Sequence, residues 1–206
     1  MGLNLQSTSG KLLASAALVA AAAGVAGLGT YGAFTSTTSA TASVSSGTVT
    51  IGLGTAGTAA NRITVAATGL VAGDTVQRAA TLTNSGSQDM AAVTLTTAAT
   101  TTSILDTDST NGLQVAIDRC SVPWTEAGTD PAYTYTCTGT PTVVLATRPV
   151  IGSNLALTNL ASITAASTDN LRVTETLPGT AGDTFQGKLS VVSFTFNGTQ
   201  RSATNK

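Results

Sequence analysis

The chain has 206 residues, with 9 Lys or Arg, 10 Asp or Glu and no His, which gives a net charge of −1. Charged residues make up only 9% of it, whereas about 25% is usual in soluble domains. Thr, which favours strands over helix interiors, supplies about a fifth of the chain. This composition disfavours an all-α fold and offers no basic surface for nucleic acid. It also removes the commonest general base and zinc ligand.

Residues 1–33 predict a signal peptide rather than part of the fold. Lys11 precedes an apolar run, rich in Ala and Gly, that ends near Gly29. A spanning helix needs about 20 predominantly apolar residues, so a membrane anchor is the weaker interpretation. We therefore expect export, removal of the peptide by a signal peptidase and no stable membrane anchor afterwards. Small residues allow cleavage before Phe34 or before Thr41, and composition does not choose between them.

From residue 44 onward, apolar residues alternate with hydroxyl residues at a period of two, and Gly, Asn and Asp turns separate the runs. Strands of this kind bury one face and expose the other, which is typical of an antiparallel sandwich. We expect an all-β fold, an antiparallel β-sandwich of nine or ten strands in one domain over residues 47–206. The runs lie at 49–53, 63–65, 93–96, 113–117, 155–157 and 171–173.

The last predicted strand, 188–196, changes phase between Val191 and Val192. Either a β-bulge or a strand that is apolar on both faces would explain this change. Because this strand carries two of the four Phe residues, we expect it to be central. Residues 97–112 and 161–170 are rich in Thr, Ala, Ser and Asp, and they predict long loops with a short helix near 159–166.

Cys120 and Cys137 are the two cysteines of the chain, and the segment between them can turn back on itself. In an exported protein such a pair predicts a disulfide. The alternative is a reactive thiol, for which Arg119 is the nearest cation.

Carboxylates are the acid or base groups that remain without His. The nearest pairs are Asp106 with Asp108 and Asp169 with Glu175, and in loops of this composition we interpret them as solvated turn residues. Asp106, Asp108 and Asn111 also resemble a calcium loop, although its Gly comes late and its closing Glu is missing. We expect no cofactor, with structural calcium as the alternative.

Residues 34–46 predict a separate N-terminal arm. Within 34–44 the even positions form a small or apolar stripe, and the odd positions are all Ser or Thr. Cleavage after Ala33 would free this arm to add as a donor strand to the sheet of another copy, and repeated head-to-tail contacts make a filament. The alternative is an arm that is disordered or pairs within its own domain. The stripe comprises Phe34, Ser36, Thr38, Ala40, Ala42 and Val44.

The motif at residues 29–34, Gly-Thr-Tyr-Gly-Ala-Phe, and further short segments between residues 46 and 200 resemble the bacterial TasA/camelysin family, which is exported with a signal peptidase of the SipW type. They comprise this N-terminal motif, two turns that flank a strand, and a closing strand, in the family's order. Together they cover roughly half of the chain, and residues 97–170 have no counterpart. The segments are 29–34, 46–51, 70–75, 83–87, 185–188, 193–196 and 199–200.

The resemblance implies a jelly-roll sandwich, cleavage between Ala33 and Phe34, and a biofilm-matrix fibre subunit at the cell surface or in the extracellular matrix. The subunits would form a homopolymer by strand donation, with an accessory fibre anchor as a further partner. Camelysin members are also described as metallo-endopeptidases, but the absence of His favours a protein that is not an enzyme. A third alternative is a non-polymerising adhesin that uses Trp124, Tyr133 and Tyr135.

Overall fold

The computed structural model describes residues 47–63 and 69–203, and all of these belong to one unit, Ser46–Lys206. Within these residues there are ten strands and two short helices, and no helix there has the length and apolar character needed to cross a membrane. The strands are β1 (Ile51–Leu53), β2 (Thr75–Asn84), β3 (Met90–Thr101), β4 (Gln114–Cys120), β5 (Thr125–Thr129), β6 (Ala132–Thr136), β7 (Pro141–Pro149), β8 (Gly152–Leu157), β9 (Thr168–Thr176) and β10 (Val191–Gln200). The helices are α2 (Ile104–Thr107) and the 3₁₀ turn η1 (Asp183–Phe185).

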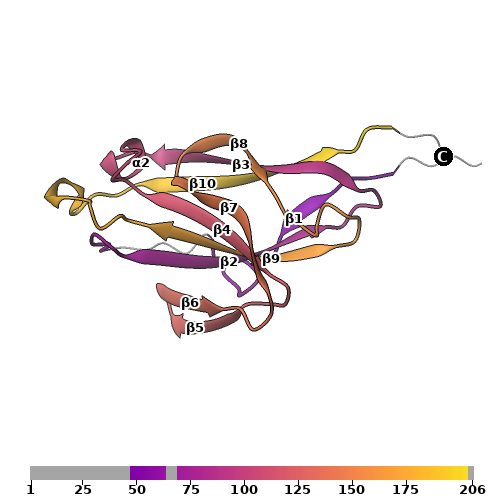
Figure 1. Cartoon of the computed structure of the whole chain (residues 1–206), viewed down its shortest axis with the longest axis horizontal. Helices are drawn as coiled ribbons and strands as arrows, with labels where there is room; N and C mark the ends of the chain where they lie inside the picture. Colours follow the sequence, from indigo (N-terminus) through magenta and orange to yellow (C-terminus); the bar gives the residue numbers. More distant parts are fainter. Residues whose placement is uncertain (1–46, 64–68, 204–206) are drawn as a thin grey trace, which may run out of the picture. The chain divides into compact units, whose positions relative to one another are not determined.

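The strands form two sheets that face each other, and a separate hairpin of β5 and β6 (Figure 1). One sheet has the strand order β1-β2-β9-β4-β7 and the other has the order β10-β3-β8. Every pair of neighbouring strands is antiparallel. The predicted all-β antiparallel class is therefore confirmed, and the finer jelly-roll order stays a prediction.

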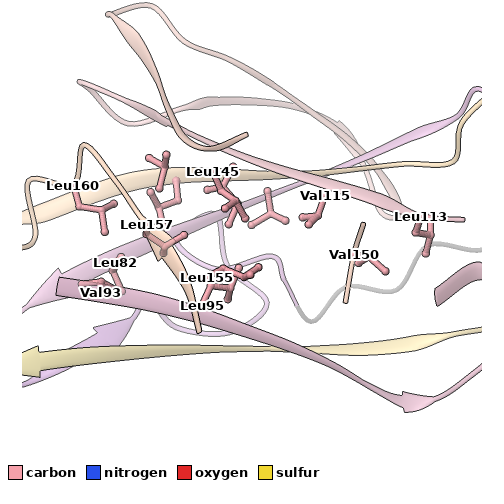
Figure 2. Packing of buried hydrophobic residues seen from close by; sticks show 14 of the residues in the cluster. Leu82, Val93, Leu95, Leu113, Val115, Leu145, Val150, Leu155, Leu157 and Leu160 are labelled. Atoms are coloured by element: carbon pink, nitrogen blue, oxygen red, sulfur yellow. The ribbon is translucent and has the colours of Figure 1, made fainter. Parts of the chain in front are cut away.

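The core lies between the two sheets, and Figure 2 shows apolar side chains of both sheets converging there. On β3, Val93 and Leu95 are fully buried, while Thr94 and Thr96, which alternate with them, are partly exposed. This is the period of two that the sequence shows, with the apolar face turned inward. The core of the five-stranded sheet includes Leu82, Val115, Ile117, Val144, Leu145, Leu171 and Val173, and that of the other sheet adds Leu155 and Leu157.

Strand β10 has its bulge at the predicted place, because its register against β3 shifts between Val191 and Val192. The shift brings Val192, Phe194 and Phe196 to the partly buried face of the strand. The expectation of a central strand is wrong. Within the described residues β10 pairs with β3 alone, so it is the edge of its sheet.

Parts of the two predicted loops, 97–112 and 161–170, belong to strands or to a helix. Strand β3 continues to Thr101, and Ser103 caps α2 through a capping box with Asp106, so only part of 97–112 is loop. Strand β9 already begins at Thr168, and the preceding residues 161–166 make turns rather than a helix. Of the strand predicted at 63–65, Ile63 lies in a turn, and the other two residues lie outside the described part of the chain.

Candidate functional site

An apolar cavity of about 780 Å³ opens between the two sheets beside β10. We call it the β10 groove. Strands β1, β2 and β9 line it from the five-stranded sheet, and the first four residues of β10 line it from the other. Residues from α2 and η1 close the end where β10 begins. Its apolar lining consists of Leu53, Ile63, Leu70, Val76, Leu105, Leu113, Phe185, Leu189, Val191, Val192 and Phe194.

The rim of the β10 groove is unusually apolar for a water-facing surface. Leu53, Leu189 and Val191 are 37%, 60% and 46% exposed, and they make up half of the six large hydrophobic residues exposed in the described chain. The edge of β10 runs beside them without a partner strand among the described residues. An open apolar groove next to an unpaired strand edge is a site for an additional strand.

Three charged side chains, Arg78, Glu175 and Lys188, lie in this lining, and the first two come from strands β2 and β9. In β9 the inward positions alternate through Leu171 and Val173 to Glu175, and the register places Glu175 opposite Val76 of β2. Burial raises the pKa of the Glu175 carboxyl, and the positive charge of Arg78 opposes that rise. Burial also lowers the pKa of Arg78. The sequence singles out Glu175 only as a solvated turn carboxylate and gives no reason to select Arg78, although a Glu in phase with two core residues is a signal of an inward position.

The described chain begins at the end of the sandwich opposite the closed end of the groove. Thr48 bonds to the β2–β3 turn, with its N–H donating to Ser87 Oγ at 3.1 Å and its carbonyl accepting from Gln88 N at 3.2 Å. Strand β1 then runs from this turn toward the end that carries α2, as Figure 1 shows from right to left. The first described residue, Gly47, therefore lies beside the β2–β3 turn, at the end of the sandwich away from α2.

The predicted arm and cleavage site lie outside the described residues. This applies to Ala33 and to every residue of the donor stripe. The stripe comprises Phe34, Ser36, Thr38, Ala40, Ala42 and Val44.

Asp106 and Asp108, two of the three residues of the calcium alternative, accept hydrogen bonds within the chain through their carboxylate oxygens. Asp106 accepts hydrogen bonds from Ser103 N, Thr102 Oγ1 and Ser190 Oγ. Burial is the largest single effect on its pKa and raises it, but the hydrogen bonds together outweigh burial and hold the pKa below its ordinary value. Asp108 accepts from the backbone N–H groups of Asn111 and Thr110, which lower its pKa. The first aspartate therefore caps α2 and ties it to the segment before β10, while the second fixes the turn that follows.

The pair Asp169 and Glu175 lies in strand β9, so the expectation of solvated turn residues is wrong for it. The two residues share the inward face of β9, but they are six positions apart, which separates them by about 20 Å along a strand. Asp169 is buried and accepts from Ala161 N and Ser162 N. At that distance the two carboxylates cannot act as one acid and base pair on a substrate.

Cys120 and Cys137, the predicted pair, are joined by a disulfide with Cα atoms 5.7 Å apart. The bond closes the segment that carries the β5–β6 hairpin. Within this segment Trp124 donates through Nε1 to Asn170 O, and Tyr135 is 5% exposed. Tyr133 lies beneath the guanidinium of Arg62, 4.6 Å from the ring centroid. The aromatic residues that we considered for adhesion thus contact the sandwich itself.

The side chains of this protein do not provide the ligands that the catalytic zinc of a metallo-endopeptidase needs. A catalytic zinc needs three protein ligands, drawn from His, Cys, Asp or Glu. The chain has no His, and both Cys are bridged. Within the described residues no three Cys, Asp or Glu side chains are grouped to hold an ion, and the segments outside contain none of these residue types. The residues present therefore do not fit a zinc site.

Comparison with known proteins identifies the family. The family model described as "Camelysin metallo-endopeptidase" matches residues 8–205. No curated protein matches the chain in sequence. The family match includes residues 97–170, for which the short motifs have no counterpart. It therefore extends over the disulfide and the hairpin, and the chain belongs to the TasA/camelysin family.

Proposed function

We propose that this protein is a secreted structural subunit of extracellular fibres and that it has no catalytic role. Residues 34–44 of one copy add as a strand to the β10 groove of the next copy. Export through a signal peptidase, with cleavage between Ala33 and Phe34, frees the arm. The polymer lies in the extracellular matrix or at the cell surface, where an accessory protein anchors one end of the fibre.

The observation that carries this proposal is the apolar groove beside the edge of β10, with which no strand of the described residues pairs. A strand added there would pair with β10 and cover Leu189 and Val191, which are exposed in the described chain. At about 25 cal/mol per Å² of apolar surface, covering such side chains favours association. The main-chain hydrogen bonds along β10 would fix the direction of the added strand.

The position of the N-terminus supports donation between copies. Because the described chain begins at Gly47, opposite the closed end of the groove, an arm that continued the line of β1 backwards would extend toward a neighbour. An arm of that direction would not enter its own groove. A head-to-tail contact of this kind does not close on itself, so repeated addition produces a filament.

The proposal is tested by electron microscopy of the chain that begins at Phe34 beside a chain that lacks residues 34–44. Circular dichroism establishes whether each chain is folded. We expect filaments from the longer chain and folded, dispersed particles from the shorter one. Filaments that persist without the arm would contradict the proposal.

Two single substitutions test the groove itself. Val191→Asp places a charge at the rim of the β10 groove, and we expect it to abolish filaments without unfolding the protein, because Val191 is 46% exposed. Val143→Asp is the matched control. Val143 is 54% exposed and lies on β7, at the edge of the five-stranded sheet. Loss of filaments in the control alone would move the acceptor edge from β10 to β7.

A metallo-endopeptidase is the second candidate, because that activity stands in the description of the matching family. The ligand set of the chain does not fit a zinc site, so we rank this function below the fibre subunit. The test is hydrolysis of casein by the purified chain with and without a chelator. Proteolysis that the chelator removes would establish the activity, and no hydrolysis at high protein concentration would exclude it.

A non-polymerising adhesin is the remaining alternative. It requires free aromatic side chains on the β5–β6 hairpin, whereas Trp124 and Tyr135 pack or bond within the protein. Surface binding that is lost on reduction of the disulfide, while filaments persist, would support this function.

A further inference from the structure

Glu175 is a carboxylate in the β10 groove to which no described residue donates a hydrogen bond. The groups that act on it are the apolar surroundings, through burial, and the charge of Arg78. Lys188 also lines the groove but forms no ion pair with Glu175 in the described chain. Water in the open groove can solvate this carboxylate, so it is tolerated only while the groove is open.

A strand that covers the groove would raise the free-energy cost of burying the Glu175 carboxylate. An added strand would displace the water, and a buried polar group without a hydrogen bond costs roughly 1–3 kcal/mol, or more when it is charged. A strand that brings a hydrogen-bond donor to this position avoids that cost, whereas a wholly apolar strand does not. The groove therefore selects for a strand with one polar, donating side chain on its inward face.

The arm carries such donors in the required phase. When residues 34–44 lie on the edge of β10 with the apolar stripe inward, Phe34, Ala40, Ala42 and Val44 face the core. The same stripe contains two hydroxyl residues, Ser36 and Thr38. The odd positions carry further Ser and Thr residues, but that phase would turn all of the apolar residues to solvent.

We propose that Glu175 is the recognition residue of the β10 groove, where the hydroxyl of Ser36 or Thr38 from the neighbouring copy donates a hydrogen bond to its carboxylate. This inference rests on the proposed function and identifies the polar contact that sets the register of the donated strand. A shift of two residues keeps the stripe inward but moves a given hydroxyl away from Glu175, so one register is favoured over its neighbours.

A double-mutant cycle on fibre assembly tests the contact. The measured quantity is the critical concentration of the chain that begins at Phe34, determined by sedimentation. We expect Glu175→Leu to raise it about tenfold, the size of one hydrogen bond to a charged acceptor. Either Ser36→Ala or Thr38→Val raises it by a similar factor. Combined with Glu175→Leu, that variant is no worse than either single change, because both partners are then apolar.

The chain offers matched controls on the opposite stripe. Thr37→Val and Ser39→Ala make the same chemical changes at outward positions, and we expect the critical concentration to stay unchanged. Glu175→Gln keeps an acceptor oxygen and assembles close to the wild type. Thermal unfolding of the dispersed subunits shows whether each variant is folded.

The outcomes separate this inference from the proposed function. If Glu175→Leu assembles as well as the wild type, or if its effect adds to those of Ser36→Ala and Thr38→Val, the recognition role is wrong. Loss of filaments on deletion of the arm would still uphold strand donation in that case. If no filaments form, binding of a synthetic peptide of residues 34–46 to the full chain decides. A peptide that fails to bind, or that binds equally well without both inward hydroxyls, overturns the inference.

Discussion

The guanidinium of Arg172 lies 4.4 Å from the ring centroid of Trp124 and joins the disulfide-closed segment to the outer face of the five-stranded sheet. The same guanidinium donates to Asp118 Oδ2 at 2.9 Å and to Tyr135 O at 3.3 Å. One side chain of β9 therefore contacts both ends of the segment that carries the hairpin. The hairpin is a docked part of the fold rather than a free loop.

Trp124→Ala removes the ring from this contact together with its hydrogen bond to Asn170 O. We expect the free energy of unfolding to fall by about 2 kcal/mol, from lost apolar burial and the lost cation–π contact. Urea denaturation followed by far-ultraviolet circular dichroism measures the change. Val122→Ala, at an exposed residue of the same segment, is the control and should change stability little. Equal effects of the two substitutions would contradict docking through Trp124.

Reduction of the Cys120–Cys137 disulfide is expected to lower the free energy of unfolding by about 3 kcal/mol, since the bond closes a short loop in the unfolded chain. The measurement is urea denaturation of the oxidised protein and of the Cys120→Ser/Cys137→Ala variant. Because Arg172 and Trp124 still hold the segment, we expect the fluorescence maximum of the single Trp to stay the same in the folded variant. A red-shifted maximum would show that the disulfide alone docks the hairpin.

The core strands can be predicted from the sequence, because the alternation of apolar and polar residues is contained within each strand. Val93 and Leu95 lie in phase with the buried face of β3, as the period of two predicts. Strand β7 escaped prediction because Val143, Val144 and Leu145 are consecutive apolar residues, and its pairing with β4 contains register shifts. Where two strands slip past each other, the simple alternation disappears from the sequence.

The groove and the docked hairpin depend on contacts between distant residues. Nothing near Val191 in the sequence shows that β10 is an edge strand, because that follows from the order of the whole sheet. The contact of Arg172 with Trp124 likewise joins residues on separate strands and loops. Helix α2 did have a local signal, since Ser103 and Asp106 have the spacing of a capping box within a segment interpreted as loop.

Ionisation of Tyr135, in the hairpin, makes the stability of the protein depend on pH in the alkaline range. Burial and the hydrogen bond from its hydroxyl to Glu126 raise the pKa of Tyr135 to about 12, from an ordinary value of 10.0. The folded state thus holds the proton more tightly than the unfolded state. Its stabilising effect is complete below pH 10 and is lost as the pH rises toward 12. We expect stability to fall across that range in the wild type and less in Tyr135→Phe.

The matching measurement is ultraviolet titration of the phenols. One phenol should ionise near pH 12 in the folded protein, and Tyr135→Phe should remove that step. Glu126→Gln is expected to move the ionisation of Tyr135 to lower pH, because it removes the carboxylate that accepts the hydrogen bond from the Tyr135 hydroxyl. An unchanged step in this variant would assign the raised pKa to burial alone.

Asp169 is the residue whose loss should damage the sandwich most. Its side chain is fully buried, pairs with Arg119 at 3.2 Å and accepts from the backbone N–H groups of Ala161 and Ser162. It therefore holds the turn before β9 against β4. Asp169→Ala leaves all three donors without their acceptor, and we expect a loss of about 3 kcal/mol in the free energy of unfolding.

Asp89→Ala is the matched control for this prediction, because Asp89 accepts one exposed hydrogen bond from Ala165 N of the same turn region. That substitution should cost about 1 kcal/mol or less. Asp169→Asn keeps an acceptor oxygen but loses the charge that pairs with Arg119, so its stability should lie between the wild type and Asp169→Ala. Urea denaturation of the four proteins tests this order. If Asp169→Ala were no less stable than Asp89→Ala, the buried carboxylate would not be what fixes the turn to the sheet.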